Sequence, residues 1–262
     1  MSIIRKTRQL LTPQSLLRTA ANFRPEDGVS KELPWIVSWA RTGSEFREAL
    51  RLRTDAYGRH FPGTASAFDD HDLARTAFIL TARDKRTGGL LGSMRVAFGV
   101  NEQIEMLLFH PQPGLLLDVR LGEARRLSLE PSRYATLVKL SLWKAFWLAC
   151  VTHSVEKLLI AARPPVNDDY RLLMFEEAMP GGAWFEPHSV PDRHELLVLP
   201  VENLEERYRR HSTELHRFMF VLEHPDIEVI PGGAVNPMFG VDAKRLLSDP
   251  RDQPTPELGL SV

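Results

Sequence analysis

The sequence predicts a mixed α/β domain in which a largely antiparallel central sheet is flanked by helices. Three observations support this fold class. Short segments rich in aromatic and β-branched residues alternate with segments of helical periodicity, turn residues separate them, and one long apolar helix is expected in the middle of the chain. Hydrophobic residues make up 43% of the 262 residues and charged residues 26%, which is typical of a globular protein.

The expected domain begins with a strand and a helix, followed by two antiparallel strands. Residues 35–40 combine aromatic and β-branched side chains, as strands do. An amphipathic helix follows over about residues 44–57, with a serine as its N-cap. Residues 77–82 and 90–98 are expected to pair as a hairpin, because the segment 84–89 between them is rich in turn residues.

The middle of the domain is expected to contain a strand at 119–129 and then the longest helix, at about 133–153. The apolar segment 157–161 is interpreted as a buried strand. A helix at about 167–177 follows, with an asparagine or an aspartate as its N-cap and a Pro-Gly-Gly sequence after its end.

The last part of the domain is expected to form a hairpin of residues 184–187 and 195–201, followed by a charged helix at 204–222. Several prolines in the last forty residues indicate loops. The chain therefore divides into an N-terminal arm (1–32), an α/β domain (33–222) and a loop-rich C-terminal extension (223–262).

The charge balance and the single cysteine exclude several classes of protein. The 33 Lys and Arg residues are balanced by 34 Asp and Glu residues, so no overall field attracts nucleic acid. Cys150 is expected to be buried and cannot form a disulfide within the chain, which fits a reducing compartment. The N-terminus lacks an apolar signal segment, and the apolar run 137–151 contains two lysines and is shorter than the roughly 20 residues of a membrane span. A cytoplasmic protein without a transmembrane segment is therefore expected.

The charged residues on the strand at 119–129 are the most informative feature of the sequence. Glu123 and Arg125 are expected on one face of the strand, and Arg126 on the other face with Gly122 and Ala124, unless a bend or bulge changes the alternation. Unpaired buried charge is costly, and such conflicts are concentrated at functional sites. An edge strand with a solvated face, or a structural ion-pair network, is the alternative interpretation.

Further charged residues precede this strand at defined intervals. The whole set consists of an arginine four residues before a tyrosine, two aspartates, an arginine late in a strand and the charged strand itself: Arg53, Tyr57, Asp69, Asp72, Arg95 and Glu123-Ala124-Arg125-Arg126-Leu127. In its order and spacing, the set resembles that of the acyl-homoserine lactone synthases, and still more that of the long-chain N-acyl amino acid synthases. The resemblance extends over about residues 35–200.

The resemblance implies a fold like that of the N-acetyltransferases (the GNAT fold), an acyl thioester as donor, commonly on acyl carrier protein, and a small-molecule amine as acceptor. It also implies that Glu123 faces the reacting amine, and a carboxylate there is the candidate base that removes the proton of this amine. Arg95 and Arg126 are candidates to bind the carboxylate of an amino acid acceptor. The residues implied to form or brace an ionic network are Arg53, Asp69, Asp72, Arg95 and Arg126.

Three other arginines are candidate contacts with the acidic surface of a carrier protein, although solvated surface arginines are the alternative: Arg125, Arg133 and Arg163. The turn at 130–136 contains no glycine, whereas acetyl-CoA-dependent relatives usually bind pyrophosphate with a glycine-rich turn at this place. A thioester of acyl carrier protein, or else acyl-CoA, is therefore the expected co-substrate, and no tightly bound cofactor is expected.

No metal site is expected, and other catalytic motifs are absent from the sequence. The chain has no Gly-x-Ser-x-Gly, phosphate-binding loop, His-Glu-x-x-His or paired-cysteine motif. His60, His71 and Asp72 are close in sequence but are interpreted as polar loop residues rather than metal ligands.

The sequence therefore favours an N-acyltransferase that moves a medium or long acyl group to the amine of an amino acid or similar small molecule. Acyl-homoserine lactone synthesis and CoA-dependent N-acetylation are the enzymatic alternatives. A non-catalytic domain of the same fold that binds an acyl chain or a protein is the alternative outside enzymes.

Overall fold

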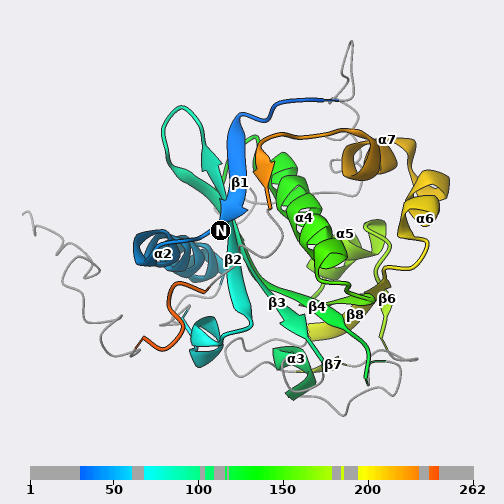
Figure 1. Cartoon of the computed structure of the whole chain (residues 1–262), viewed down its shortest axis with the longest axis horizontal. Coiled ribbons are helices and arrows are strands. Elements are labelled where there is room, and N and C mark those ends of the chain that lie inside the picture. Colours follow the sequence, from blue (N-terminus) through cyan, green and yellow to red (C-terminus); the bar gives the residue numbers. More distant parts are fainter. Residues whose placement is uncertain are drawn as a thin grey trace, which may run out of the picture.

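The computed structural model describes residues 30–60, 68–100, 104–108, 116, 118–178, 184–185, 194–229 and 236–241. In these residues, one sheet of nine strands has the order β6-β8-β5-β4-β3-β2-β1-β9, with β7 also paired to β8 (Figure 1). The strands are β1 (Trp35–Trp39), β2 (Ala77–Asp84), β3 (Leu90–Gly99), β4 (Leu121–Leu129), β5 (Lys157–Ala162), β6 (Glu176–Glu177), β7 (Trp184–Phe185), β8 (His194–Pro200) and β9 (Ile227–Glu228).

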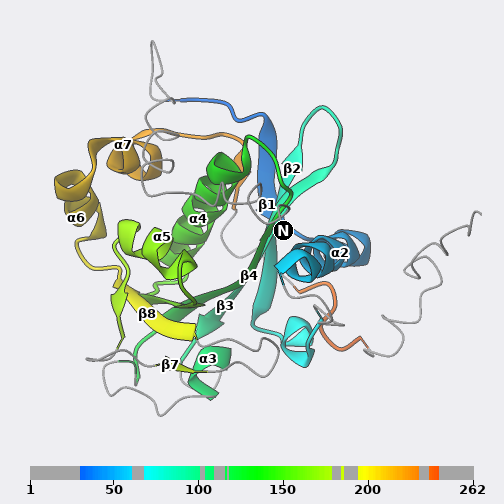
Figure 2. The same ribbon diagram turned by 180° about the vertical axis from the view of Figure 1, so that it is seen from behind.

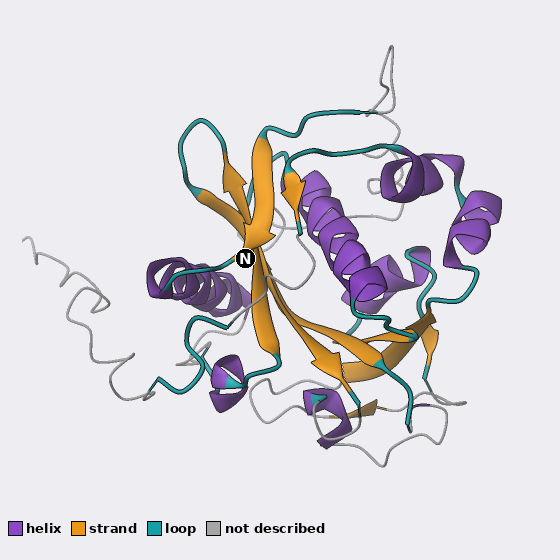
Figure 3. Ribbon diagram, in the orientation of Figure 1, coloured by secondary structure: helices purple, strands orange, loops and turns teal. Residues whose placement is uncertain are grey.

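Helices cover both faces of the sheet, as Figure 3 shows by colour. α2 lies on one face, and α4 and α5 lie on the other, an arrangement that is also visible from behind in Figure 2. The helical segments are α2 (Gly43–His60), the 3-10 turn η1 (Asp70–Leu73), α3 (Glu105–Leu108), α4 (Ala135–Thr152), α5 (Val166–Leu172), α6 (Leu204–His211), α7 (Thr213–His216) and the π-helical turn η4 (Arg217–Val221).

The sheet is largely antiparallel, which confirms the predicted fold class. Only the pairs β4–β5 and β1–β9 are parallel among the described strands. β4 and β5 pair only over four residues each, the last pair being Ala124 with Ile160, although β4 continues to Leu129. Beyond Ala124, β4 has β3 on one side and no described strand on the other, so the two halves of the sheet separate there.

The core helix α4 packs closely on the sheet at two glycines. A Cβ atom on Gly92 would lie 2.8 Å from Cγ1 of Val138, and one on Gly122 would lie 2.9 Å from Sγ of Cys150. By length and composition alone α4 could cross a membrane, but 72% of its apolar window is buried inside this domain. Cys150 is buried, as predicted, and burial raises the pKa of its thiol.

Two predicted helices are wrong at their ends. The helix expected at 167–177 ends at Leu172, because Met174 adopts a φ of 67° and the next residues form β6 beside β8. The helix expected at 204–222 is interrupted at Ser212, whose extended backbone breaks the hydrogen-bonding pattern and whose hydroxyl accepts the N–H of Leu215 to cap α7. The other predicted strands and helices are confirmed, with ends that differ by a few residues.

Residues beyond 222 also contribute to the sheet. β9 pairs with β1, and a carboxylate oxygen of Asp226 accepts the backbone N–H of Leu33 at 2.7 Å. Met238 is 4% exposed and packs against Phe46 and its neighbours. Residues 1–29 of the expected arm lie outside the described part of the chain, and the division into arm, domain and extension stays a prediction.

Candidate active site

A β-bulge in β4 determines which way Arg126 points. Ser93 faces Ser128 and Arg95 faces Arg125, so β4 contains one residue more than β3 between these pairs. Arg126 adopts a φ of 56°, in the left-handed region that is uncommon for residues other than glycine. The bulge turns its side chain toward the face that carries Arg95, and the predicted placement of Arg126 on the opposite face is therefore wrong.

The five residues expected to form an ionic network do so. Arg53 donates to both carboxylate oxygens of Asp72, at 2.9 and 2.8 Å, and the two side chains are 1% and 0% exposed. Arg95 donates to Asp69 at 2.6 Å and to Asp72 at 3.0 Å. Arg126 donates to the second oxygen of Asp69 at 2.5 Å. The network thereby connects four parts of the fold, namely α2, β3, β4 and the loop that contains η1.

The loop with the two aspartates is fixed by its own backbone and by a distant residue. The N–H of Asp69 donates to Oδ2 of Asp72 at 3.0 Å. The Nδ2 of Asn236 donates to the carbonyls of Asp72 and Ala74, at 2.8 and 2.9 Å, and its Oδ1 accepts the N–H of Met238 at 2.9 Å. Asn236 is buried and was not identified from the sequence, because nothing in the local pattern connects it to residues 160 positions earlier.

The electrostatic surroundings hold Asp69 as an anion. Burial alone raises the pKa of a carboxyl group, but the combined attraction and hydrogen bonds of Arg95 and Arg126 outweigh this and keep the pKa of Asp69 below its ordinary value. The surrounding carboxylates likewise raise the pKa of Arg95 in spite of its burial. Loss of one partner from such a buried network leaves a charge uncompensated, at a cost of about 3–5 kcal/mol.

A second carboxylate, Glu105 of α3, was also missed by the sequence reasoning. Its side chain forms ion pairs with Arg95 and Arg125. Its backbone N–H and that of Met106 each donate to Glu123 at 3.0 Å, one to each carboxylate oxygen. The sequence of the short segment 104–108 matches no known motif, so its position against β4 could not be predicted.

Glu123 lies where β4 and β5 begin to separate. It faces Leu159 of β5, one residue before the last pair of these strands. The side chain is 3% exposed, and burial raises the pKa of Glu123 to about 7, against the attraction of Arg125 and with added repulsion from Glu105. The distance from Oε1 of Glu123 to Nη1 of Arg125 is 3.8 Å.

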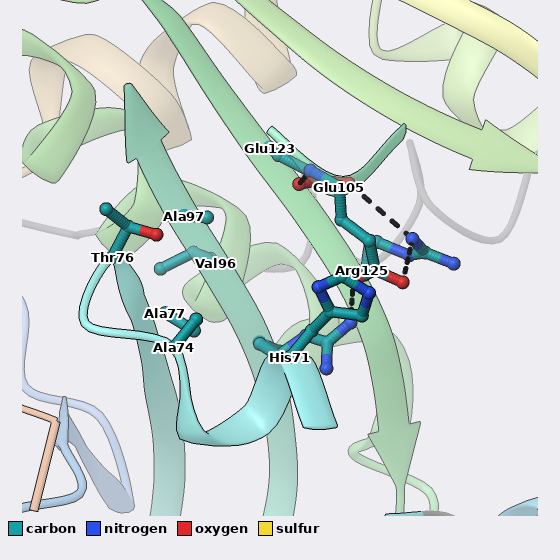
Figure 4. Close-up of a pocket in the computed structure, with 10 residues that line it drawn as sticks. His71, Ala74, Thr76, Ala77, Val96, Ala97, Glu105, Glu123 and Arg125 are labelled. Atoms are coloured by element: carbon teal, nitrogen blue, oxygen red, sulfur yellow. Dashed lines mark hydrogen bonds and ion pairs between the residues drawn. The ribbon is translucent and has the colours of Figure 1, made fainter. Parts of the chain in front are cut away.

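Glu123 and Arg125 line a cavity of about 100 Å³ (Figure 4). Charged and polar side chains occupy one part of the wall, and small side chains from β2, β3 and the preceding loop form the rest. The lining residues are His71, Arg95, Glu105, Glu123, Arg125, Ala74, Thr76, Ala77, Val96 and Ala97. A carboxylate with a pKa near neutrality beside a guanidinium is suited to removing a proton and to binding an anionic group.

The remaining predicted site residues are distributed differently. Arg125 lies in the cavity wall beside Glu105 with 11% of its side chain exposed, a position that does not favour the expected contact with a carrier protein. Arg133 is exposed and lies 4.7 Å from the ring centre of Tyr134. Arg163 directly follows β5 and is partly buried. The ring of Tyr57 lies 5.8 Å from the guanidinium of Arg126.

The residues considered as metal ligands do not form a metal site in the part of the chain that is described. His71 lines the cavity, whereas Asp72 is engaged by two arginines. The side chain of His60 lies outside the described residues. Across all described ranges, no group of three or more His, Cys, Asp or Glu side chains is arranged to hold a metal ion.

The turn before α4 uses its own backbone N–H groups. The hydroxyl of Ser132 accepts the N–H of Tyr134 at 3.2 Å, and its carbonyl accepts the N–H of Ala135 at 3.2 Å. At the same corner, Arg59 donates to the carbonyl of Leu129 at 3.2 Å. Two backbone amides at the start of α4 are therefore already bonded within the turn.

No protein-family model and no curated protein sequence matches the chain. The structure is similar to FeeM, an N-acyl amino acid synthase from uncultured soil microbes, with a TM-score of 0.57 and 14% identity over 68% of this chain and 94% of that one. It is also similar to BjaI, a CoA-dependent acyl-homoserine lactone synthase, with a TM-score of 0.50 and 14% identity over 72% and 93% of the two chains. These similarities show that the chain has the GNAT fold of the N-acyltransferases.

Proposed function

We propose that the protein is an N-acyltransferase that moves a medium or long fatty acyl group from an acyl-carrier-protein thioester to the amine of an amino acid or similar small molecule. One observation carries the proposal: Glu123 is a buried carboxylate with a pKa of about 7, in a cavity at the point where β4 and β5 separate. A perturbed carboxyl group in a cavity is typical of a catalytic base.

The reaction requires a neutral amine, whereas an amino group with a pKa of roughly 8 or higher is mainly protonated at neutral pH. Glu123 removes the proton, and the amine nitrogen attacks the thioester carbonyl carbon. The new C–N bond replaces the C–S bond, and the leaving thiolate takes up a proton to become a thiol. The backbone N–H groups of Glu105 and Met106 hold Glu123 in place for this transfer. General base catalysis of this kind contributes about 10²–10⁴ in rate.

The separation of β4 and β5 supports the proposed donor. Beyond Ala124, one edge of β4 pairs with no described strand, so an extended arm with amide groups can form strand-like hydrogen bonds there. A pantetheine arm in this position brings its thioester beside Glu123. Backbone N–H groups of β4 near the bulge are the proposed donors to the oxyanion of the tetrahedral intermediate.

The size of the cavity supports its assignment to the acceptor. Sites for drug-sized molecules commonly enclose roughly 300–1,000 Å³. The cavity beside Glu123 measures about 100 Å³, which suits the amine-bearing end of a small molecule rather than a medium or long acyl chain. The acyl chain is therefore placed outside this cavity, along the separation between the strands.

The turn before α4 supports a carrier protein over free CoA, because Ser132 already occupies two of its N–H groups. Exposed Arg133 and the nearby Arg59 are the proposed contacts with an acidic carrier protein, with Arg163 as a further candidate. Acyl-homoserine lactone synthesis from acyl-CoA is the second candidate function, favoured by the structural similarity to BjaI. A cytoplasmic location is proposed because acyl carrier protein and CoA thioesters occur there.

The test compares donors directly. The full chain is incubated separately with palmitoyl-carrier protein, palmitoyl-CoA and acetyl-CoA, each with pooled amino acids, and N-acylated products are detected by mass spectrometry. We expect a long-chain amide that depends on the carrier protein. An acetylated product alone would support CoA-dependent acetylation instead, and no product from any donor would favour a non-catalytic binding domain.

A further inference from the structure

The cavity beside Glu123 contains a guanidinium that is suited to binding the rest of the acceptor. From the sequence, Arg95 and Arg126 were the candidates for binding an acceptor carboxylate. In the structure, protein carboxylates engage both of them. Arg95 lines the cavity but binds Asp69, Asp72 and Glu105, and Arg126 binds Asp69 and does not line the cavity. Their place in the network leaves Arg125 as the cavity arginine to consider.

Arg125 uses only one of its three side-chain nitrogens for ion pairs. Nη1 pairs with Glu105 and lies 3.8 Å from Glu123. Nη1 is itself buried without a hydrogen-bond partner in the described ranges, so its contact with Glu105 is an ion pair only. No hydrogen bond joins Nε or Nη2 of Arg125 to another described residue. The guanidinium lines the cavity beside the two glutamates, as Figure 4 shows. The Nε–H and one Nη2–H of an arginine lie parallel and match the two oxygens of a carboxylate.

The balance of charge in the site favours an anion beside Arg125. The network and the cavity together contain four arginines and four carboxylates: Arg53, Arg95, Arg125, Arg126, Asp69, Asp72, Glu105 and Glu123. When Glu123 has taken the proton of the acceptor's ammonium group, the arginines exceed the remaining protein carboxylates by one. The carboxylate of the acceptor then restores the balance and replaces the hydration that burial removes from the guanidinium.

The spacing of Glu123 and Arg125 fits one small molecule. The two residues are separated by one residue on the same face of β4, which places their Cα atoms about 6.6 Å apart along the strand. An α-amino acid has its ammonium and carboxylate groups on the same carbon atom. A single amino acid bound in the cavity against both side chains can therefore direct its nitrogen toward Glu123 and its carboxylate toward Nε and Nη2 of Arg125.

We propose that Arg125, and not Arg95 or Arg126, binds the carboxylate of an amino acid acceptor. The inference rests on the proposed function in one respect, the assignment of the cavity to the acceptor. It concerns binding, however, and is tested without acyl transfer.

The experiment measures binding to the full chain in the absence of any acyl donor. Each of the twenty α-amino acids is titrated by calorimetry at millimolar concentrations, and every one that binds is compared with its α-amide. We expect at least one amino acid to bind and its amide to bind at least tenfold more weakly, because the amide offers the guanidinium one acceptor atom and no charge.

Variants of Arg125 and of a surface arginine complete the test. Arg125→Lys keeps the charge but loses the paired donors, so we expect about tenfold to hundredfold weaker binding of the amino acid and little change for the amide. Arg210→Lys is the matched control at a position where 78% of the side chain is exposed, and it should bind both ligands as the wild type does. Circular dichroism confirms that each variant is folded.

The possible outcomes separate this inference from the proposed function. Equal affinity for amino acid and amide, binding unchanged in Arg125→Lys, or no amino acid bound at all would overturn the role of Arg125, even if acyl transfer is observed. Arg125-dependent amino acid binding with no product from any acyl donor would support the carboxylate site and contradict the proposed acyltransferase.

Discussion

Two carboxylates of the site differ in behaviour because they have different partners. Asp69 binds two guanidinium groups, Arg95 at 2.6 Å and Arg126 at 2.5 Å, and its pKa is held low. Glu123 accepts hydrogen bonds from two backbone N–H groups, and its ion pair with Arg125 is 3.8 Å long. The effect of burial therefore outweighs the attraction of Arg125, and the pKa of Glu123 rises to about 7. One group is therefore a fixed anion and the other a proton acceptor near neutral pH.

The raised pKa of Glu123 predicts a pH-dependent effect on stability. With an ordinary pKa of 4.5 in the unfolded chain and about 7 in the folded chain, the folded state binds more protons between these values. The contribution of Glu123 to stability is thus full below pH 4.5 and is lost as the pH rises through 7. Relative to the wild type, Glu123→Gln should gain stability over this range, by up to about 3 kcal/mol.

Urea unfolding at several pH values measures this difference. Glu123→Gln also loses a hydrogen bond to one of the N–H groups of α3, but that loss is the same at every pH and cancels in the comparison. Glu130→Gln, at the exposed residue directly after the same strand, is the control for replacing a glutamate with glutamine. A stability difference that does not vary between pH 4.5 and 7 would mean that Glu123 has an ordinary pKa.

Single residues were predicted well where charge and order in the sequence identify them. The ionic network and the burial of Glu123 follow from a cluster of charges that is too costly to leave unpaired in a sheet. Glu105 and Asn236 could not be found in this way, because each belongs to a short segment whose contacts are set by tertiary packing. The direction of Arg126 depends on a bulge that alternation along a strand does not encode.

At the scale of elements, the site depends on segments that brace one another across the chain. η1 presents Asp72 to the network, and Asn236 holds the backbone of this turn through two carbonyls. α3 closes the cavity with Glu105 and orients Glu123 through its N–H groups. The segment 236–241 therefore affects the site although none of its residues lines the cavity.

Asn236→Ala tests the coupling between this segment and the site. The variant leaves the carbonyls of Asp72 and Ala74 without their donor, which should cost about 1–3 kcal/mol in the free energy of unfolding. Because the aspartate loop moves relative to Arg95, acyl transfer by the folded variant should also fall. Denaturant unfolding and initial rates measure the two effects.

The control for this variant is Phe239→Ala, in the same segment. The side chain of Phe239 is 57% exposed, so its removal should change neither stability nor rate appreciably. If Asn236→Ala lowers stability but the folded protein retains full activity, the segment supports the fold and not the site.

At the scale of the whole molecule, hydrophobic patterning was sufficient to predict the fold class. The strands expected at 35–40, 77–82, 90–98 and 157–161 and the long apolar helix are all present. Strand order was not predictable, because pairing of β5 with both β4 and β8 is long-range and leaves no local pattern. The predicted ends of two helices were wrong, because Met174 and Ser212 each adopt a backbone conformation that ends a helix.

The architecture explains why the site lies where it does. β1 to β4 form one half of the sheet, and β5 with β8 forms part of the other, and the two halves are joined by only the first residues of β4 and β5. Glu123 is at the end of this junction, with the cavity on one face and, beyond it, the edge of β4 that pairs with no described strand. An acceptor in the cavity and a donor along the edge therefore meet at the same carboxylate.

The role of Glu123 as the base is tested most directly by the rate of acyl transfer as a function of pH. The rate is measured for the wild type and for Glu123→Gln, with saturating donor and acceptor. We expect the wild-type rate to rise with pH and to level off above about pH 7, where Glu123 is ionised. The variant should be about 10²–10⁴-fold slower at neutral pH, with a smaller deficit at high pH where free amine is abundant. Full activity of the variant, or the same loss at every pH, would contradict the role of Glu123 as the base.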